Sequence, residues 1–293
     1  EMQRSLVGSE MCIRDRLNFA QYTQATDTMK KISVIGVGNM GGAIAIGLAR
    51  SGYAVAVTNR SGVMPDYLAG FENITMAESN ADAAKGSDVI IIAVKSSSFK
   101  AVVDDIGKSV DFNHSVIVVL CADLRIAQIE EDFADYDKAP MIARLMPNTA
   151  VAVGQSMSFI CTNAYAAAYS AELCKVFSPL GRVEVIDETK FSAATLLCSC
   201  GIAYAYRYIR ASVEGAVALG FEPREARNYI CQTLRGAADM LEHYDLNPEV
   251  AIDMVTTPGG LTIAGLNDME RAGFTPAVLA GLRRRNSQID FID

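Results

Sequence analysis

The feature that most constrains this chain is a glycine-rich turn between a predicted strand and a predicted helix. Residues 36–41 read Gly-Val-Gly-Asn-Met-Gly; the β-branched run 31–35 precedes them and an apolar run at 43–49 follows. In such a unit the first glycine makes the turn, the second admits a pyrophosphate close to the backbone, and the third allows close helix–strand packing. Because a helix N-terminus also favours phosphate charge, the pattern predicts dinucleotide binding rather than a purely structural turn.

The end of the second predicted strand distinguishes NAD from NADP. Enzymes that use NAD usually place an acid there, which binds the ribose 2′-hydroxyl. Residues 54–58 form this strand, and Asn59, Arg60 and Ser61 follow it without an acid. Arg60 can pair with a 2′-phosphate and its neighbours can donate hydrogen bonds to it, although a loop arginine can also be merely solvated. We therefore predict NADPH as the cofactor, with NADH less favoured.

Six apolar runs in the first half predict strands that alternate with helices. They are residues 31–35, 54–58, 88–94, 115–120, 141–145 and 156–161. Such alternation is typical of a parallel, doubly wound sheet. The sequence therefore predicts an N-terminal Rossmann-like domain of the α/β class.

The second half changes character and is predicted to be all-helical. Residues 188–219 are mostly apolar and lack proline, which indicates one long helix buried on nearly every side; Gly220 and Pro223 end it and begin the next. A helix that is apolar all round needs a partner to cover it. We predict a homodimer formed through a C-terminal helical dimerisation domain, with domain limits at 29–186 and 187–293.

The first 28 residues differ from the rest and enter no fold prediction. They contain no sustained apolar run, and residues 3–16 resemble translated sequencing-adapter sequence. We expect this leader either to be non-native, with Met29 as the natural start, or to be a disordered tail.

Charge and cysteine content narrow the function classes. The formal net charge is −8, whereas a nucleic-acid surface needs a basic stripe. The seven cysteines are scattered without the spacing of a zinc or redox motif, and two histidines supply a metal site poorly. We therefore expect a cytoplasmic protein with reduced thiols and with no metal, nucleic-acid or membrane partner.

A second glycine turn, in the helical half, can bind a carboxylate. Residues 256–262 read Thr-Thr-Pro-Gly-Gly-Leu-Thr. Gly259 and Gly260 expose backbone N–H groups, and Thr257 and Thr262 add hydroxyl donors. The same residues can equally form a structural turn between two helices.

Several motifs, in this order, resemble the pyrroline-5-carboxylate reductase family from Met29 to about Leu282. They are residues 34–41, Ala93-Val94-Lys95, residues 144–149 (Arg-Leu-Met-Pro-Asn-Thr) and, most distinctive, residues 253–266 around the second glycine turn. The resemblance implies a Rossmann-like domain followed by a helical dimerisation domain, and homodimers that can form larger rings. It also implies NADPH-dependent reduction of 1-pyrroline-5-carboxylate to L-proline, the last step of proline biosynthesis.

The resemblance assigns roles to matching positions. The cofactor would be bound by Gly36, Gly38, Asn39, Met40, Gly41, Asn59, Arg60, Asn80, Val94 and Lys95, and the substrate by Thr257, Gly259, Gly260, Thr262 and Glu188. Thr262 is the expected proton donor, directly or through water, or a positioning group because a hydroxyl is a poor acid. Glu188 is the second catalytic candidate, although a carboxylate at a helix start can simply complement the helix dipole.

Departures from the family pattern leave the exact substrate open. Ser96 and Ala150 stand where proline is usual, Asp123 enters a small-residue turn, and residues 199–204 carry Cys200 and Ile202 and lose a glycine and a proline. The alternatives are a diverged reductase of another cyclic imine or keto acid, and a catalytically silent NADP-binding regulator. A β-hydroxyacid dehydrogenase shares the two-domain plan but uses a lysine in the central helix, and residues 191–222 contain none.

Overall fold

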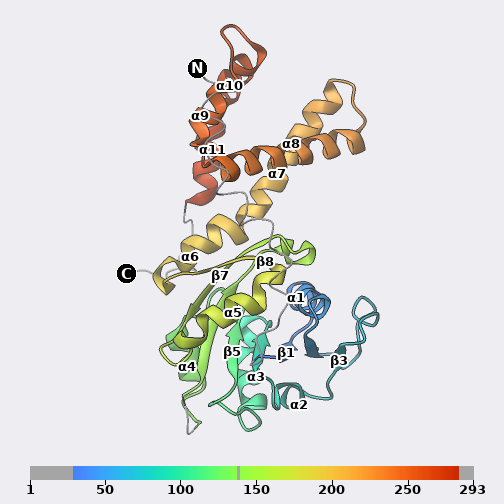
Figure 1. Cartoon of the computed structure of the whole chain (residues 1–293), viewed down its shortest axis with the longest axis vertical. Coiled ribbons are helices and arrows are strands. Elements are labelled where there is room, and N and C mark those ends of the chain that lie inside the picture. Colours follow the sequence, from blue (N-terminus) through green and yellow to red (C-terminus); the bar gives the residue numbers. More distant parts are fainter. Residues whose placement is uncertain (1–28, 137–138, 284–293) are drawn as a thin grey trace. The chain divides into compact units, whose positions relative to one another are not determined.

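The computed structural model describes residues 29–136 and 139–283, so the prediction for the leader lies outside the described residues. The chain divides into two compact units, of which the first ends at Thr195 and the second begins at Leu196 (Figure 1). The predicted limit between residues 186 and 187 falls earlier in the chain and stays a prediction.

The first unit is built on an eight-stranded sheet with the order β3-β2-β1-β4-β5-β6-β7-β8. Its strands are β1 (Lys31–Ile35), β2 (Ala54–Thr58), β3 (Ile74–Met76), β4 (Val89–Ile92), β5 (Val116–Val119), β6 (Met141–Met146), β7 (Ser156–Thr162) and β8 (Gly181–Val185). The doubly wound, Rossmann-like sheet is thereby confirmed. All neighbours are parallel except β6 and β7, which run antiparallel because the short connection 147–155 cannot cross over the sheet.

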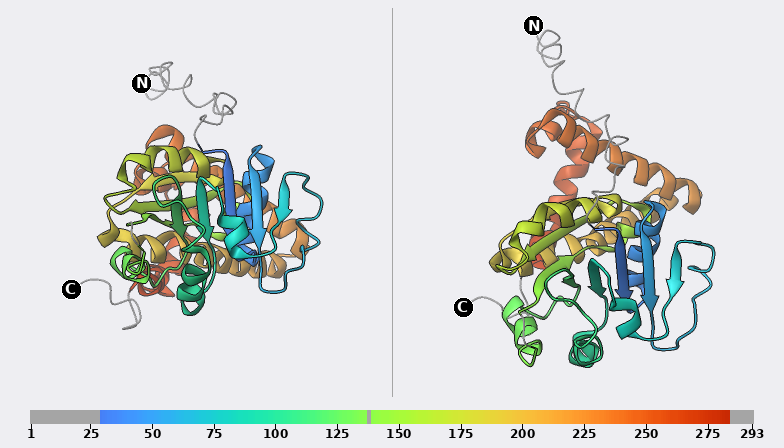
Figure 2. Two further views of the ribbon diagram at one scale, coloured as in Figure 1. Left: turned by 90° about the horizontal axis from the view of Figure 1, so that it is seen from below. Right: turned by 60° about the horizontal axis from the view of Figure 1, so that its bottom comes forward.

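Alternate residues of the central strands enter two separate cores, one on each face of the sheet. Figure 2 shows the helices that cover the two faces. In β4, Val89 and Ile91 pack with helices α1 (Asn39–Arg50) and α5 (Ser170–Phe177). Ile90 and Ile92 pack on the other face with α2, α3 and α4. The ranges of these three helices are Asn80–Ala84, Phe99–Ile106 and Ile126–Asp132. Burial on both faces explains why the central strands read as continuous apolar runs.

The two strands that the sequence does not predict are β3 and β8, at opposite edges of the sheet. β3 has only three residues. β8 is only partly buried and carries an ion pair between Arg182 Nε and Glu184 Oε1 at 2.9 Å. Short or charged strands are usual at sheet edges, and they lack the apolar run by which a strand is recognised.

The segment 188–219 is helical but is not the single regular helix that we predict. It contains a 3₁₀ turn at Glu188–Lys190, α6 at Phe191–Ala194, a π-helical turn at Thr195–Ser199 and α7 at Gly201–Ala218. The Thr195 hydroxyl donates to the Phe191 carbonyl at 2.8 Å, in competition with the regular backbone ladder. A local side-chain bond of this kind is not visible in an apolar pattern.

The second unit is helical, as predicted. Beside α7 it contains α8 (Pro223–Tyr244), α9 (Pro248–Asp253), α10 (Leu261–Arg271) and α11 (Phe274–Leu282). Gly220 and Pro223 separate α7 from α8 as expected. The Tyr204 hydroxyl donates to the Gly281 carbonyl at 2.8 Å, which ties α7 to α11. None of the helices described in residues 29–136 and 139–283 is long and apolar enough to cross a membrane.

The predicted burial of α7 requires a partner, so it stays a prediction, and in the single chain the helix is open. No residue of α7 is buried, and Tyr204, Tyr206 and Tyr208 are 41%, 57% and 40% exposed. Large apolar side chains on other helices of the unit are also exposed, including Leu261 and Leu279. An apolar surface of this kind needs a partner to cover it.

Candidate active site

A cavity of about 980 Å³ opens at the carboxyl ends of β1 and β4 in the first unit. Here the strand order turns, with β2 on one side of β1 and β4 on the other, and open α/β sheets bind ligands at such points. Of the predicted cofactor residues, the cavity is lined by Gly36, Gly38, Asn59, Arg60, Asn80, Val94 and Lys95. The structure therefore brings together residues from four separate parts of the sequence.

The three positions of the first turn that hold glycine require it for different physical reasons. Gly36 has φ +98, and an added Cβ would lie 2.7 Å from the Ala93 carbonyl oxygen. A Cβ on Gly41 would collide with the Gly36 carbonyl oxygen. An added Cβ on Gly38 would meet no protein atom within 4 Å, so packing within the protein does not require this glycine. A ligand that approaches the backbone at Gly38 does require it.

Helix α1 begins at this turn and presents its N-terminus without a competing side chain. Gly38 is its N-cap, no side chain caps it, and no acid lies in its first turn. Its free N–H groups can therefore stabilise an anion. Asn39, Met40 and Gly41 do not line the main cavity; Asn39 lines a smaller one of about 300 Å³, and Met40 packs on the core. Cofactor binding by these three residues stays a prediction and would use their backbone N–H groups.

The loop after β2 presents Arg60 and uses its neighbours to hold its shape. Asn59 Nδ2 donates to the Val63 carbonyl at 2.8 Å, and Ser61 Oγ donates to Asn59 Oδ1 at 2.9 Å. Arg60 is exposed and makes no hydrogen bond or ion pair with the residues that the structure describes. Its guanidinium is thus available to an anionic ligand, whereas the Asn59 side chain is already engaged.

Sequence reasoning misses one wall of the cavity, which α3 and the residue before it provide. Ser98, Ala101, Val102 and Asp105 line the cavity. Their spacing of three and four residues, directly after Ala93-Val94-Lys95, is that of one helical face and is the signal that could have identified them.

The Cys121 thiol lies directly beneath the cavity wall. Its Sγ donates to the Val94 carbonyl at 3.2 Å. Burial, together with the nearby Asp123 carboxylate, raises the pKa of Cys121 to about 12 against the opposing effect of Arg144. Cys121 is therefore a neutral thiol at physiological pH.

We expect Cys121 to resist alkylation in the folded protein. At about pH 8 an ordinary thiol is partly ionised and reactive, whereas a thiol with a pKa of about 12 is almost wholly protonated. Peptide mapping after iodoacetamide treatment should find Cys121 unmodified in native protein and modified after denaturation. Equal labelling in both states would contradict the buried placement.

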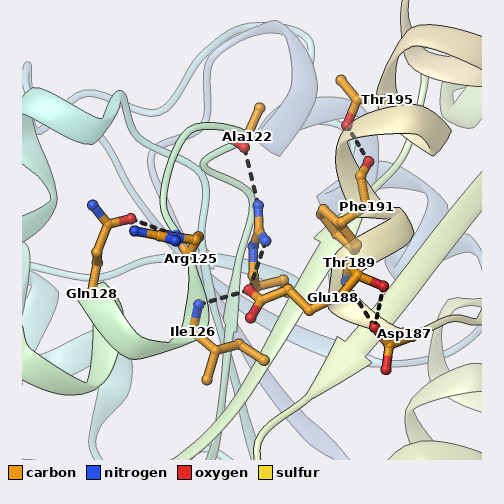
Figure 3. Close-up of polar contacts among 10 residues, drawn as sticks. Ala122, Arg125, Ile126, Gln128, Asp187, Glu188, Thr189, Phe191 and Thr195 are labelled. Carbon is orange, nitrogen blue, oxygen red and sulfur yellow. Dashed lines mark hydrogen bonds and ion pairs between the residues drawn. The ribbon is translucent and has the colours of Figure 1, made fainter. Parts of the chain in front are cut away.

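A clamp of polar contacts surrounds Glu188, at the beginning of the segment that leads into the helical half (Figure 3). Arg144 on β6 is only 3% exposed, and its Nη1 donates to Glu188 Oε1 at 2.8 Å. Its Nη2 donates to the Ala122 carbonyl at 3.0 Å, and its Cζ lies 4.1 Å from the centre of the Phe191 ring. The backbone N–H of Ile126 also donates to Glu188 Oε1, at 2.7 Å. The Glu188 carboxylate therefore joins β6 to the beginning of α4, and Arg144 also ties in the turn after β5. The contact of Glu188 with substrate stays a prediction.

The other predicted substrate residues lie together in the second unit, at the beginning of α10. Gly259 has φ +70, and the Gly260 N–H donates to the Thr257 carbonyl at 2.9 Å. Gly260 caps α10, no acid lies in the first turn, and Thr262 is the second residue of the helix. Within the described part of the chain the Thr262 hydroxyl has no hydrogen-bond partner. This turn has the donors and the dipole that a carboxylate needs.

The departures from the family pattern fall mainly at helix beginnings. Ser96 opens the 3₁₀ turn Ser96–Ser98, and Ala150 is the second residue of the 3₁₀ helix Thr149–Val153. Cys200 precedes α7 and Ile202 is its second residue. Proline is tolerated at such positions but is not needed there, so its loss leaves the local helix intact.

Two family models match the chain. Pyrroline-5-carboxylate reductase dimerisation matches residues 188–288, and NADP oxidoreductase, coenzyme F420-dependent, matches residues 31–122. The pyrroline-5-carboxylate reductase of Pisum sativum is 34% identical over 263 residues, which cover 86% of this chain and 94% of that protein. The chain belongs to the pyrroline-5-carboxylate reductase family. The predicted family resemblance is thereby confirmed.

Other members of the pyrroline-5-carboxylate reductase family agree in sequence and fold. Pyrroline-5-carboxylate reductase 1 of Dictyostelium discoideum is 37% identical over 269 residues, and the chain spans about half (48%) of its length. The solved structure of the 1-pyrroline-5-carboxylate reductase of Streptococcus pyogenes superposes with a TM-score of 0.75 at 27% identity, over 86% of this chain and 95% of that one. The family therefore accounts for both the sheet and the helical unit.

Proposed function

We propose that this chain reduces 1-pyrroline-5-carboxylate to L-proline with NADPH, the last step of proline biosynthesis. The observation that carries the proposal is the cavity at the turn of the strand order, which Gly38 and Arg60 line, in a member of this family. The reaction is that of an oxidoreductase acting on a CH–NH bond.

The residues of the cavity fit NADPH. Gly38 leaves the backbone open to a pyrophosphate, and the uncapped N-terminus of α1 stabilises its charge. Arg60, which has no partner among the described residues, binds the 2′-phosphate, and Asn59 holds the loop that presents Arg60. Val94 and Lys95 line the cavity at the end of β4. When bound, NADPH supplies the hydride.

The turn at the beginning of α10 is proposed to hold the substrate. The Gly259 N–H and the free N–H groups of the first turn of α10, which Gly260 caps, bind the carboxylate together with the Thr257 hydroxyl at the positive end of the helix dipole; the Gly260 N–H itself is engaged by the Thr257 carbonyl. Thr262, in the first turn of α10, donates a hydrogen bond toward the ring nitrogen. Because a threonine hydroxyl is a poor acid, its main role is to orient the ring nitrogen, and water supplies the proton.

Glu188 is proposed to act beside the substrate through a fixed orientation rather than as an acid. One of its carboxylate oxygens accepts hydrogen bonds from both Arg144 and Ile126, and its side chain is 32% exposed. The clamp therefore holds the carboxylate in one direction while leaving part of it accessible.

Replacement of Thr262 by alanine should lower turnover with pyrroline-5-carboxylate by about 10- to 100-fold while NADPH affinity stays within about twofold. Thr262 lies outside the predicted cofactor residues, so only the chemistry and substrate orientation should suffer. Steady-state rates and fluorescence titration with NADPH measure the two effects. Thr262→Ser is the matched control, because it keeps the hydroxyl and should recover most of the activity. Wild-type turnover in Thr262→Ala would remove Thr262 from the mechanism.

Homo-oligomers follow from the exposed apolar helices of the second unit and from its match to the dimerisation model. We propose a homodimer that can assemble further into a ring, in the cytoplasm, where the six described cysteines stay reduced. Light scattering should give at least twice the 31.4 kDa mass of the chain. A monodisperse species of single-chain mass would contradict the proposed dimer.

The function is tested by product formation. Purified full-length chain, NADPH and pyrroline-5-carboxylate should yield L-proline in one-to-one proportion to the NADPH consumed. NADPH consumption with another imine or keto acid but without proline would favour a diverged reductase. NADPH binding without turnover on any of these substrates would favour a silent regulator.

A further inference from the structure

An acidic side chain lines the cavity that is proposed to bind a polyanion. Asp105, near the end of α3, is exposed at the cavity wall. Near the several negative charges of NADPH a carboxylate is unfavourable unless it accepts a hydrogen bond from the ligand or is neutralised. Asp105 makes no ion pair with the described residues; its contact is the amide of Asn80, whose Nδ2 donates to Asp105 Oδ2 at 2.9 Å.

A short chain of hydrogen bonds places Asp105 at the adenosine end of the cavity. The Thr58 hydroxyl donates to Asn80 Oδ1 at 2.7 Å, and Asn80 in turn donates to Asp105. Thr58 ends β2 and stands two residues before Arg60, the proposed ligand of the 2′-phosphate. The nicotinamide must lie away from this phosphate, so Asp105 lies on the side of the adenine and its ribose.

The wall that carries Asp105 suits a flat base. Ala101 and Val102 give it an apolar surface, and Asp105 stands one turn further along the same face of α3. Asp104, the preceding residue, does not line the cavity and pairs with Lys100 at 3.0 Å on another face of the helix. The two neighbouring carboxylates therefore have different surroundings, although both belong to α3 and both are acidic.

We propose that Asp105 determines specificity for the adenine base of the cofactor by accepting a hydrogen bond from its exocyclic amine. This inference rests on the proposed use of NADPH. The Asn80 amide binds one carboxylate oxygen of Asp105, whose side chain lines the cavity. A base that carries a carbonyl in place of the amine brings a second hydrogen-bond acceptor against the Asp105 carboxylate, and it therefore binds less well.

Nucleotide binding without turnover tests this role. Calorimetric titration would compare NADP⁺ with its hypoxanthine analogue, in which a carbonyl replaces the adenine amine. Wild-type protein should bind NADP⁺ roughly fivefold to tenfold more tightly than the analogue, since one charge-assisted hydrogen bond at an exposed site is lost. Asp105→Ala should weaken NADP⁺ and leave the analogue almost unchanged, so that the preference falls below about twofold.

Two further variants distinguish a direct contact of Asp105 with the adenine amine from an indirect effect in which Asp105 only positions Asn80. Asp105→Asn keeps an acceptor for the amine or for Asn80 without the charge and should show an intermediate preference. Asp104→Ala removes the neighbouring carboxylate outside the cavity and should keep the full preference. A change that acts only through Asn80 would weaken both nucleotides alike and leave their ratio unchanged.

The outcomes distinguish this inference from the proposed function. Equal affinity of wild-type protein for both nucleotides, or equal weakening of both in Asp105→Ala, would overturn the role of Asp105 while the use of NADPH stands. Failure to bind NADP⁺ at all would overturn both. A retained adenine preference in a protein that does not reduce pyrroline-5-carboxylate would support Asp105 and contradict only the proposed substrate.

Discussion

Replacement of Arg60 by alanine should weaken NADPH binding by about 10- to 100-fold and leave NADH binding within about twofold. The guanidinium is exposed in the cavity, has no partner among the described residues, and follows a strand end that lacks an acid. Its loss would remove the proposed charge-assisted hydrogen bonds to the 2′-phosphate, which NADH does not have. Dissociation constants from fluorescence titration with both cofactors measure the difference.

Arg182 provides the control for Arg60. It is also exposed in the first unit, but it pairs with Glu184 on the edge strand β8 and does not line the cavity. Arg182→Ala should leave both dissociation constants unchanged. Equal weakening of NADPH and NADH by Arg60→Ala would show that Arg60 supports the loop rather than the 2′-phosphate.

Replacement of Arg144 by methionine should lower the free energy of unfolding by about 3 kcal/mol. Arg144 is buried, and its loss leaves Glu188 Oε1 and the Ala122 carbonyl without their charged donor and removes the stacking on Phe191. Urea unfolding at a fixed protein concentration measures the change, since dimer formation makes the midpoint concentration-dependent. The activity should fall as well, because the orientation of Glu188 depends on Arg144.

The double variant Arg144→Met, Glu188→Met shows how much of this loss comes from the unpaired carboxylate. An apolar pair avoids the unpaired charge and should recover part of the stability. Arg182→Met, which breaks an exposed pair, should change the free energy of unfolding by less than about 1 kcal/mol. A similarly small change in Arg144→Met would contradict the structural importance of the clamp.

Most of the fold follows from local patterns in the sequence. Strands buried on both faces, such as β4 and β5, read as continuous β-branched runs, and the glycine turn between β1 and α1 marks the cofactor end of the sheet. The edge strands β3 and β8 have no such run, because β3 has only three residues and no residue of β8 is fully buried. The antiparallel turn between β6 and β7 depends on connection length, which apolar patterns do not report.

The sites are predictable where one short motif supplies them and not where distant residues meet. Gly36, Arg60 and the turn before α10 could each be recognised from adjacent residues. The contact of Arg144 with Glu188 joins residues that are far apart in sequence, so no local pattern reveals it. Asp105 lies in the cavity because of the helical phase of α3, whereas Asp104 beside it does not.

The most direct test of the proposed function is the rate of NADPH oxidation by the full chain across a panel of cyclic imines. The panel holds pyrroline-5-carboxylate, the same ring without its carboxylate, and the six-membered imine carboxylate. The turn before α10 is proposed to bind a carboxylate, so the highest kcat/KM should be for pyrroline-5-carboxylate, at least about 100-fold above that for the ring without the carboxylate. Tight NADPH binding without oxidation in the presence of pyrroline-5-carboxylate, or faster oxidation with another imine, would contradict the proposed function.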